Sequence, residues 1–218
     1  FHNFQHPTGN TAIPLGNNVF LGELAGNLTM GSTATSTSHA SDNIGIGLTS
    51  LYACTTGYQN VGIGTDALRN LTTGFGNICI GRWAGRKITD GELNTFIGGS
   101  TAPSCTTGNQ NFALGFASLY GVITGTGNVG IGAYSLGYAT SSYNIGIGSN
   151  AGRYVTGGGN HTTPVRSAYY GALTTGTVNA DEEIVFGYNT GGKGSLSIRL
   201  GSANTTAIYT SVADSVKL

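Results

Sequence analysis

Side chains able to act as acids, bases, nucleophiles or metal ligands are few and widely separated in this sequence. The chain has nine carboxylate residues among 218, and no Gly-x-Ser-x-Gly nucleophile elbow occurs. A glycosidase needs two facing carboxylates about 5–9.5 Å apart, whereas adjacent acids such as Glu182 and Glu183 are more typical of a solvated turn. The histidines are dispersed, at His2, His6, His39 and His161. These observations favour a protein that is not an enzyme and has no metal centre.

Two further patterns that can signal chemistry have simpler structural interpretations. Cys54, Cys79 and Cys105 form no Cys-x-x-Cys pair, and we expect each to be a small buried hydrophobic residue. The glycine-rich string 62–67 matches the loose dinucleotide fingerprint, but a true fingerprint lies between a strand and a helix. Here the string is one copy of a repeat with no helix after it, so we expect no cofactor.

Exposed aromatic side chains are the best candidates for binding a ligand. They occur at variable positions of the repeat described below, so we expect them to face outward. Tyr and Trp offer flat faces to sugars or proteins and lose little entropy on binding. The alternative is that they pack over neighbouring coils or inside an interface between chains. The candidates are Tyr52, Trp83, Tyr120, Tyr134, Tyr138 and Tyr154.

The elements that must position these side chains follow from an internal repeat of 17 residues. Each unit reads Asn, apolar, any, apolar, Gly, and it continues with a second short apolar segment and a Thr-Thr-Gly turn. Successive asparagines are separated by 17 residues five times and then by 16, which indicates a repeat architecture. The first and fifth positions are Asn43 and Gly47, Asn60 and Gly64, Asn77 and Gly81, Asn94 and Gly98, Asn111 and Gly115, Asn128 and Gly132, and Asn144 and Gly148.

Seventeen residues are too few for a repeat that contains a helix but enough for one coil of an all-β solenoid. Counting from Asn as position 1, we expect positions 2 and 4 to share one face of a strand. Small residues at position 3 suit a close contact on the opposite face. Glycine at position 5 marks a bend, and the Thr-Thr-Gly turn leaves its glycine free to take positive φ.

Stacked parallel coils would place each asparagine above the next, so that their amides form a ladder along the axis. One coil cannot bury its apolar side alone, and neighbouring coils must supply the rest of the core. Seven coils at ~4.8 Å per coil give a rod on the order of 35 Å long. The predicted fold class is therefore a β-solenoid, or parallel β-roll.

The chain divides into three segments on this pattern. Residues 1–42 contain the degenerate units 18–22 and 27–31 and then a Ser/Thr-rich loop inserted between coils, residues 43–159 hold the seven regular repeats, and residues 160–218 form an end module. The end module contains strand-glycine units at 167–171, 183–187 and 197–201, and a last strand-like stretch at 206–210.

A column of threonines at position 13 offers a different function, because flat ranks of threonine occur on ice-binding solenoids. A turn role is the favoured interpretation, since each threonine lies just before a turn and can hydrogen-bond local backbone. The column consists of Thr55, Thr72, Thr89, Thr106, Thr140 and Thr156, with Ile123 as its one exception.

Charge argues against nucleic acid and membrane partners. Only 8% of the residues are charged and the formal net charge is zero, whereas phosphate backbones and anionic lipids attract clustered Lys and Arg. The basic residues are scattered in the sequence, with Arg82, Arg86 and Lys87 as one loose group. No stretch reaches the ~18 apolar residues that span a bilayer, so we expect no membrane insertion.

The unit 60–74, with Asn60-Val-Gly-Ile-Gly64, Ala67-Leu68 and Thr72-Thr73-Gly74, resembles the repeats of bacteriophage tail fibres and tailspikes. It is also similar to the heads of trimeric autotransporter adhesins, which are parallel β-rolls with a shorter coil. The resemblance covers roughly residues 11–159. It implies a homotrimer, and small residues at position 3 together with low charge agree with extensive contact between chains.

The resemblance implies a structural segment of a tail fibre in the virion, able to bind a host-surface glycan or protein. The alternative is a bacterial cell-surface adhesin or an extracellular filament subunit, for which a C-terminal membrane anchor in the full gene would be diagnostic. A polysaccharide-cleaving tailspike and an ice-binding solenoid are less favoured.

Overall fold

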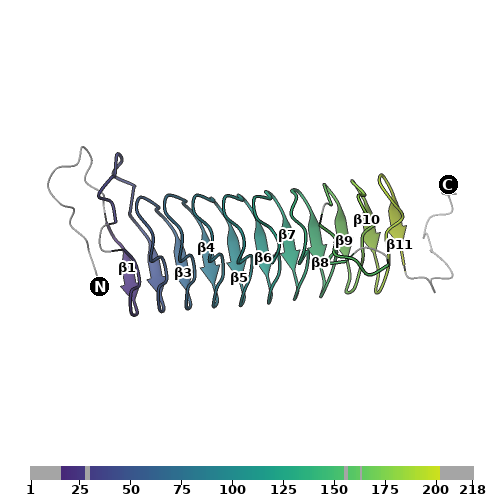
Figure 1. Ribbon diagram of the computed structural model, residues 1–218, viewed down its shortest axis with the longest axis horizontal. Coiled ribbons are helices and arrows are strands. Elements are labelled where there is room, and N and C mark those ends of the chain that lie inside the picture. The colour runs from purple at the N-terminus through teal and green to yellow at the C-terminus, as the bar shows by residue number, and fades with distance from the viewer. Residues whose placement is uncertain (1–15, 28–29, 155–156, 163, 202–218) are drawn as a thin grey trace, which may run out of the picture.

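A computed structural model describes residues 16–27, 30–154, 157–162 and 164–201. The described chain winds into a β-solenoid, drawn along its long axis in Figure 1. Eleven strands of three residues each pair in parallel and in chain order, so they form one continuous sheet along the solenoid. The described residues contain no helix. The strands are β1 (Val19–Leu21), β2 (Ile44–Ile46), β3 (Val61–Ile63), β4 (Ile78–Ile80), β5 (Thr95–Ile97), β6 (Phe112–Leu114), β7 (Val129–Ile131), β8 (Ile145–Ile147), β9 (Ala168–Tyr170), β10 (Ile184–Phe186) and β11 (Ile198–Leu200).

The glycine at position 5 turns the chain away from the sheet. At Gly64 φ is 124°, a value that L side chains rarely adopt. A Cβ on Gly64 would also lie 2.7 Å from the carbonyl carbon of Gly81 in the next coil. Both the backbone conformation and the spacing between coils therefore require glycine here.

The glycine of the Thr-Thr-Gly turn has a different role from the one expected. Gly57, Gly74, Gly91 and Gly108 do not take positive φ. Instead, a Cβ on Gly57 would lie 2.7 Å from the carbonyl oxygen of Gly74. The prediction of positive φ is wrong, because these positions need glycine for the close approach of successive coils.

The asparagine ladder is confirmed. The side-chain amide of Asn60 donates to Oδ1 of Asn43 at 3.0 Å, and Asn77 donates to Asn60 at the same distance. Each Oδ1 also accepts the backbone N–H of the next asparagine, and the same amide reaches the turn carbonyl of its own coil, as Asn60 does with Gly74 at 2.9 Å. The asparagines are buried in this column, so the ladder satisfies their polar groups away from water.

The interior lies on the side of the sheet to which position 3 points. The small residues there, including Gly62 and Cys79, are fully buried inside their own solenoid, with the position-9 and position-12 columns facing them. The expectation that position 3 takes part in contact between chains is therefore wrong. Positions 2 and 4 point outward, because successive side chains of a strand lie on opposite faces.

In five of the seven regular coils, a large residue at position 3 or position 9 faces a small residue at the other position. Where position 3 is Gly62, position 9 is Leu68, and where position 3 is Phe96, position 9 is Ala102. A Cβ on Gly62 would lie 3.4 Å from Leu51 Cγ of the preceding coil. Because the interior is closely packed, a bulky side chain at one of these two positions requires a small residue at the other.

The first coil is longer than the others. Val19 pairs directly with Ile44, so no further strand of the sheet lies between β1 and β2, and residues 28–29 of the 27–31 unit lie outside the described residues. Gly26 and Gly31 donate to the carbonyls of Ser50 and Thr55, which places this segment in the later part of the first coil. The expectation of a separate degenerate coil at 27–31 is wrong, and the segment 32–41 is an insertion within the first coil.

The sheet continues past the regular repeats through β9, β10 and β11. Between β8 and β9 the chain makes an excursion, visible in Figure 1 as the dark green loop beside β9, in which Tyr154 and Asn160 form an antiparallel bridge. The strand-like stretch expected at 206–210 lies outside the described residues.

The threonines of position 13 bind the next coil and not their own turn. Thr55 Oγ1 donates to the carbonyl of Thr72 at 3.0 Å, and Thr72 donates to Thr89 at 3.2 Å. Their hydroxyls thus join successive coils at the Thr-Thr-Gly turns. The prediction that these hydroxyls bond the backbone of their own turn is wrong, because their acceptors lie in the next coil. Thr156 lies outside the described residues.

No helix long and apolar enough to cross a bilayer occurs in the part of the chain that the structure describes.

Candidate functional site

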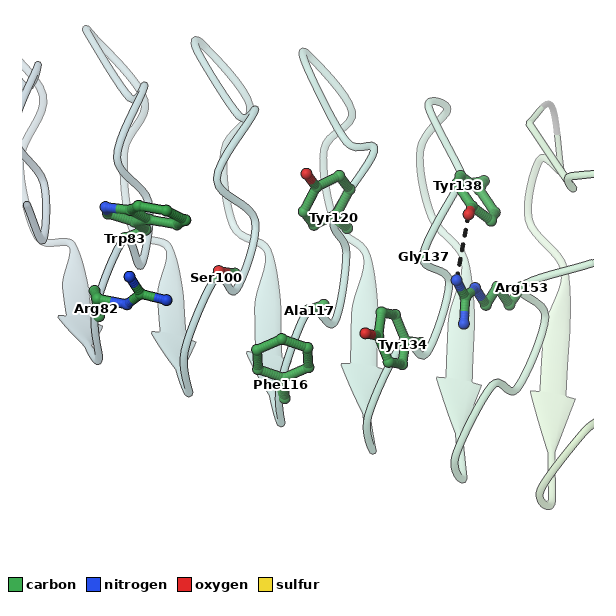
Figure 2. Close-up of a pocket in the computed structure, with 10 residues that line it drawn as sticks. All are labelled: Arg82, Trp83, Ser100, Phe116, Ala117, Tyr120, Tyr134, Gly137, Tyr138 and Arg153. Carbon is green, nitrogen blue, oxygen red and sulfur yellow. Dashed lines mark hydrogen bonds between the residues drawn. The ribbon is translucent and has the colours of Figure 1, made fainter.

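A groove of about 430 Å³ runs along one side of the solenoid, across the coils that begin at Asn77, Asn94, Asn111, Asn128 and Asn144. Figure 2 shows its aromatic side chains and two arginines on the turns that follow the strands. Its volume lies in the range of small-ligand sites. We call it the aromatic groove. It is lined by Arg82, Trp83, Ser100, Phe116, Ala117, Tyr120, Tyr134, Gly137, Tyr138 and Arg153.

Trp83 and Arg82 form one end of the aromatic groove. The Arg82 guanidinium carbon lies 4.1 Å from the centre of the indole ring, and that of Arg86 lies 5.7 Å away. The indole Nε1–H donates to Asp66 Oδ2 at 3.1 Å, which fixes the orientation of the ring. Asp66 also lies 3.8 Å from Arg86 Nε. Asp66 thus balances Arg86, while Arg82 points along the exposed side of the tryptophan.

Arg153 forms the other end of the groove and is held by three tyrosines. Its guanidinium carbon lies 4.1 Å from the ring centre of Tyr134, 5.1 Å from that of Tyr138 and 4.8 Å from that of Tyr154. Nη1 donates to Asn150 Oδ1 at 2.8 Å, and Nη2 donates to the Tyr138 hydroxyl at 3.2 Å. Stacking and hydrogen bonds together hold this cation in one place.

The middle of the groove is uncharged. Phe116 is 51% exposed and Tyr120 is 47% exposed, and the ring of Phe116 meets that of Tyr134 edge to face at 5.5 Å. Ser100 adds one hydroxyl to the lining. A molecule in the groove would therefore meet aromatic faces and hydroxyl groups between two arginines.

Four of the six aromatic residues singled out from the sequence meet in this groove, namely Trp83, Tyr120, Tyr134 and Tyr138. Tyr154 packs against Tyr138 with ring centres 6.0 Å apart, but it lines a separate hollow and not the aromatic groove. Tyr52 lies outside the groove, 6.0 Å from the Arg69 guanidinium carbon. Several of these rings also pack over neighbouring coils, which is the alternative expected for them.

The arginines of the groove were missed by sequence reasoning. Arg82 occupies position 6 of its coil, and Arg69, Arg86 and Arg153 all occupy position 10 of theirs. In the sequence they appear scattered, but stacking of the coils places the three position-10 arginines in one column, of which Arg153 lines the groove. The recurrence of position 10 could have drawn attention to Arg153, whereas no repeated position marked Arg82.

The outer face of the sheet is a second exposed feature. Its side chains at positions 2 and 4 are apolar apart from the hydroxyls of Thr95 and Tyr170, and none is charged. Exposure is highest at the two ends, where Leu21 and Ile198 are each 67% exposed. Monomeric soluble proteins rarely expose apolar patches of this continuity. We call this surface the outer sheet face.

A buried polar cluster lies in the last coils. Glu183 occupies the ladder position before β10 and is fully buried. Its carboxylate accepts bonds from Thr177 N at 2.9 Å, Thr177 Oγ1 at 2.8 Å, Gly194 N at 2.9 Å and the Tyr169 hydroxyl at 3.4 Å. The His161 ring meets Tyr169 edge to face at 5.3 Å, and neither ring nitrogen has a hydrogen-bond partner among the described residues.

Burial shifts the pKa values of two groups in this cluster. It lowers the pKa of His161 below 6.5, and the charge of Glu183 acts in the opposite direction. Burial and then the charge of Glu183 raise the pKa of Tyr169. The histidine is therefore neutral at pH 7. The cluster is closed to solvent, so it supports the fold and offers no surface for a ligand.

The interpretation of Glu182 and Glu183 as solvated turn residues is wrong for Glu183. Glu182 is half-buried and pairs with Arg166 Nη2 at 2.8 Å. Glu183 points inward because it stands where the regular coils have asparagine. The register of the ladder, and not the local charge, decides where each acid points.

The three cysteines are buried free thiols, as expected. Burial raises the pKa of Cys54 to about 12 and of Cys105 to about 11, and that of Cys79 is also raised. Thiols in this state are poor nucleophiles. No group of three or more His, Cys, Asp or Glu residues placed to hold a metal ion occurs within the described ranges.

Comparison of the chain with protein-family models, with curated proteins and with solved structures finds no match.

Proposed function

We propose that this chain is a structural segment of a bacteriophage tail fibre, which assembles as a homotrimer in the virion and helps attach it to the host surface. It acts by binding and not by catalysis. The observation that carries the proposal is the outer sheet face, an uncharged apolar strip along all eleven strands of a sheet whose interior is already closed. The repeat pattern links this strip to fibres, because the unit resembles those of tail-fibre proteins.

The outer sheet face is best covered by further copies of the same chain. The interior columns supply the core of one solenoid without help from positions 2 and 4, so the outer apolar residues are not needed to close the coil. Burying them gains about 25 cal/mol per Å² of apolar surface. Three parallel copies would bring identical strips together around one axis, and the constant spacing of the coils would keep them in register.

The proposal also accounts for the low charge of the chain. Interfaces between obligate subunits resemble a domain core and are depleted of charge. Surfaces left outside such an assembly, including the aromatic groove on the turns, would remain available to a receptor. The assembly and the attachment site then use different columns of the same coil.

The first test is the mass of the purified chain in solution, measured by light scattering before and after heating in detergent. We expect a heat-resistant species near three times 22.1 kDa. Replacing Ile63 and Ile97 by Glu on the outer sheet face should yield monomers, because the charges would be buried in the interface.

Ile123→Glu is the matched control, because Ile123 is 49% exposed at position 13, away from the sheet. It should leave the trimer intact. A wild-type chain that is monomeric at all concentrations would contradict the proposal, as would equal effects of the sheet-face and control substitutions.

A further inference from the structure

We propose that the aromatic groove binds a glycan that carries carboxylate groups, with Arg82 and Arg153 as its two anion-binding residues. The inference rests on the proposed attachment function and adds the chemical class of the ligand. It begins from the two arginines, which stand at opposite ends of the groove in Figure 2.

Neither arginine has a carboxylate partner within the described residues. The ion pairs there join Arg69 and Arg86 to Asp66, and Arg166 to Glu182. The lining of the groove also includes no acidic residue. In a chain with zero net charge, two arginines without counter-charges at one groove leave a local site for an anion.

The arginines are presented in a form suited to carboxylates. Arg153 is stacked against Tyr134 and bonded to Asn150 and Tyr138, which uses two of its five N–H donors. Arg82 lies over Trp83 and has its planar fork at the exposed surface. A guanidinium held in place by stacking loses little entropy when it forms paired bonds to a carboxylate.

The uncharged middle of the groove suits sugar rings. The exposed rings of Phe116 and Tyr120 offer negatively polarised faces to C–H groups, and Ser100 offers a hydroxyl for hydrogen bonding. The two arginines belong to coils four steps apart, which is roughly 19 Å at ~4.8 Å per step. The geometry thus fits an extended chain of rings whose acidic groups are widely spaced.

The same spacing disfavours a nucleic acid as the occupant. Single-stranded nucleic acid presents a phosphate at every nucleotide, and its sites line the whole strand with positive charge. Between Arg82 and Arg153 this groove presents only Ser100, Phe116, Tyr120 and similar neutral groups. Most phosphates would therefore lose water without gaining a cation.

The test is direct titration of the intact oligomer by calorimetry. The probes are oligogalacturonate and oligosialic acid, their carboxyl-reduced counterparts, and a thymidine oligonucleotide. We expect at least one acidic glycan to bind about tenfold or more tightly than its reduced form, since charge-assisted bonds are lost on reduction. Arg82→Gln and Arg153→Gln should each weaken that binding by a similar factor.

Lys193→Gln is the matched control, because it removes one exposed positive charge outside the groove. Trp83→Phe should weaken binding of the sugar rings while keeping the charge of Arg82. Arg82 is exposed and can be replaced without opening the core, so it remains informative if the Arg153 variant misfolds.

Three outcomes would overturn the inference: neither acidic glycan binding more tightly than its reduced form, groove variants binding like Lys193→Gln, or the oligonucleotide displacing the glycan. The mass of the oligomer is measured on the same samples. An intact trimer without glycan binding would refute the ligand and leave the fibre assembly standing, whereas a monomer would refute the assembly itself.

Discussion

The regular coils and the last coils fill the same ladder position with different chemistry. From Asn43 to Asn128 each side-chain amide donates to the asparagine before it and accepts from the one after it, so the same side chain can satisfy its own polar groups in any number of stacked copies. After Pro164 the position holds Ser167 and then Glu183. A carboxylate only accepts hydrogen bonds, and it therefore needs donors placed around it, here from its own coil and from the coil before it.

The difference shows how a repeat can be extended and how it can be ended. A self-complementary amide permits unlimited stacking at no cost in polar satisfaction. An acceptor-only group must be surrounded by individual partners, here Thr177, Gly194 and Tyr169. In the last coils each polar contact thus depends on an individual residue. In the regular coils the same contact is repeated from one coil to the next. Four substitutions or conditions can break or sharpen this contrast.

The largest effect is expected from Gly64→Ala in the regular coils. The new Cβ would meet the Gly81 carbonyl carbon at 2.7 Å while φ stays near 124°, so both strain and overlap contribute. We expect a loss of about 3 kcal/mol or more in unfolding free energy, measured by urea denaturation. Gly158→Ala is the control, because φ there is 98° with nothing within 4 Å. If both variants lost equal stability, contact between coils would not be the cause.

A smaller loss is expected from Asn94→Ala, which interrupts the ladder. It removes the acceptor for the backbone and side-chain amides of Asn111 and the donor to Gly108. Buried groups left without partners cost about 1–3 kcal/mol each, and partial relaxation should hold the total near 2–4 kcal/mol. Hydrogen exchange should show new opening on both sides of the gap. Asn70→Ala, at an exposed site, should leave exchange unchanged.

Glu183→Gln tests the acceptor-only site of the last coils. One carboxylate oxygen would become an NH₂ group facing the N–H donors of Thr177 or Gly194, so one bond would be lost and a repulsion gained. We expect about 1–3 kcal/mol, with exchange increased only after β8. The asparagine ladder of the regular coils already uses side-chain NH₂ groups as donors, so we expect Glu183→Gln to leave the ladder unchanged. Uniform destabilisation along the solenoid would contradict this separation.

The smallest effect is a pH dependence confined to the last coils. The pKa of His161 is lowered by burial, so the unfolded chain binds its proton more tightly than the folded one. This contribution to stability is complete above the unfolded pKa of ~6.5 and declines as the pH falls below it, by at most ~1.4 kcal/mol per unit. The opening free energy of the coils after β8, obtained from hydrogen exchange after correction for the intrinsic exchange rate at each pH, should fall from pH 7 to 5, and His161→Phe should remove that fall. An unchanged fall in the variant would assign it to other groups.

The sequence was sufficient to predict the coil, its period, its corner glycine and its ladder. Each of these features requires the same residue type in every coil, as Asn60 and Gly64 show. The recurrence of those residues in the sequence therefore made the features predictable. It could not tell which side of the strand was inside. The alternation of side chains along a strand separates two faces but does not tell which one is buried. Ile63 faces outward, although isoleucine is usually buried in the interior.

The candidate site was predictable in its aromatic residues and not in its arginines. Trp83 and Tyr134 stand out because they share a column at a variable position. Arg82 and Arg153 lie 71 residues apart in the sequence and become parts of one groove only through the stacking of five coils. Their missing counter-charges could be recognised only after Asp66 was placed beside Arg69 and Arg86.

The direction of the hydrogen bonds between coils has a mechanical consequence. The hydrogen bonds of a sheet run from strand to strand, roughly perpendicular to the strands. Here the strands stack along the long axis of the solenoid, so these hydrogen bonds run along that axis. A force that pulls the two ends of one chain apart therefore loads the joints between coils one after another, in series. Each coil that opens would release 17 residues, or roughly 58 Å of extended chain at ~3.4 Å per residue. A single solenoid would therefore yield stepwise under tension and absorb a sudden load.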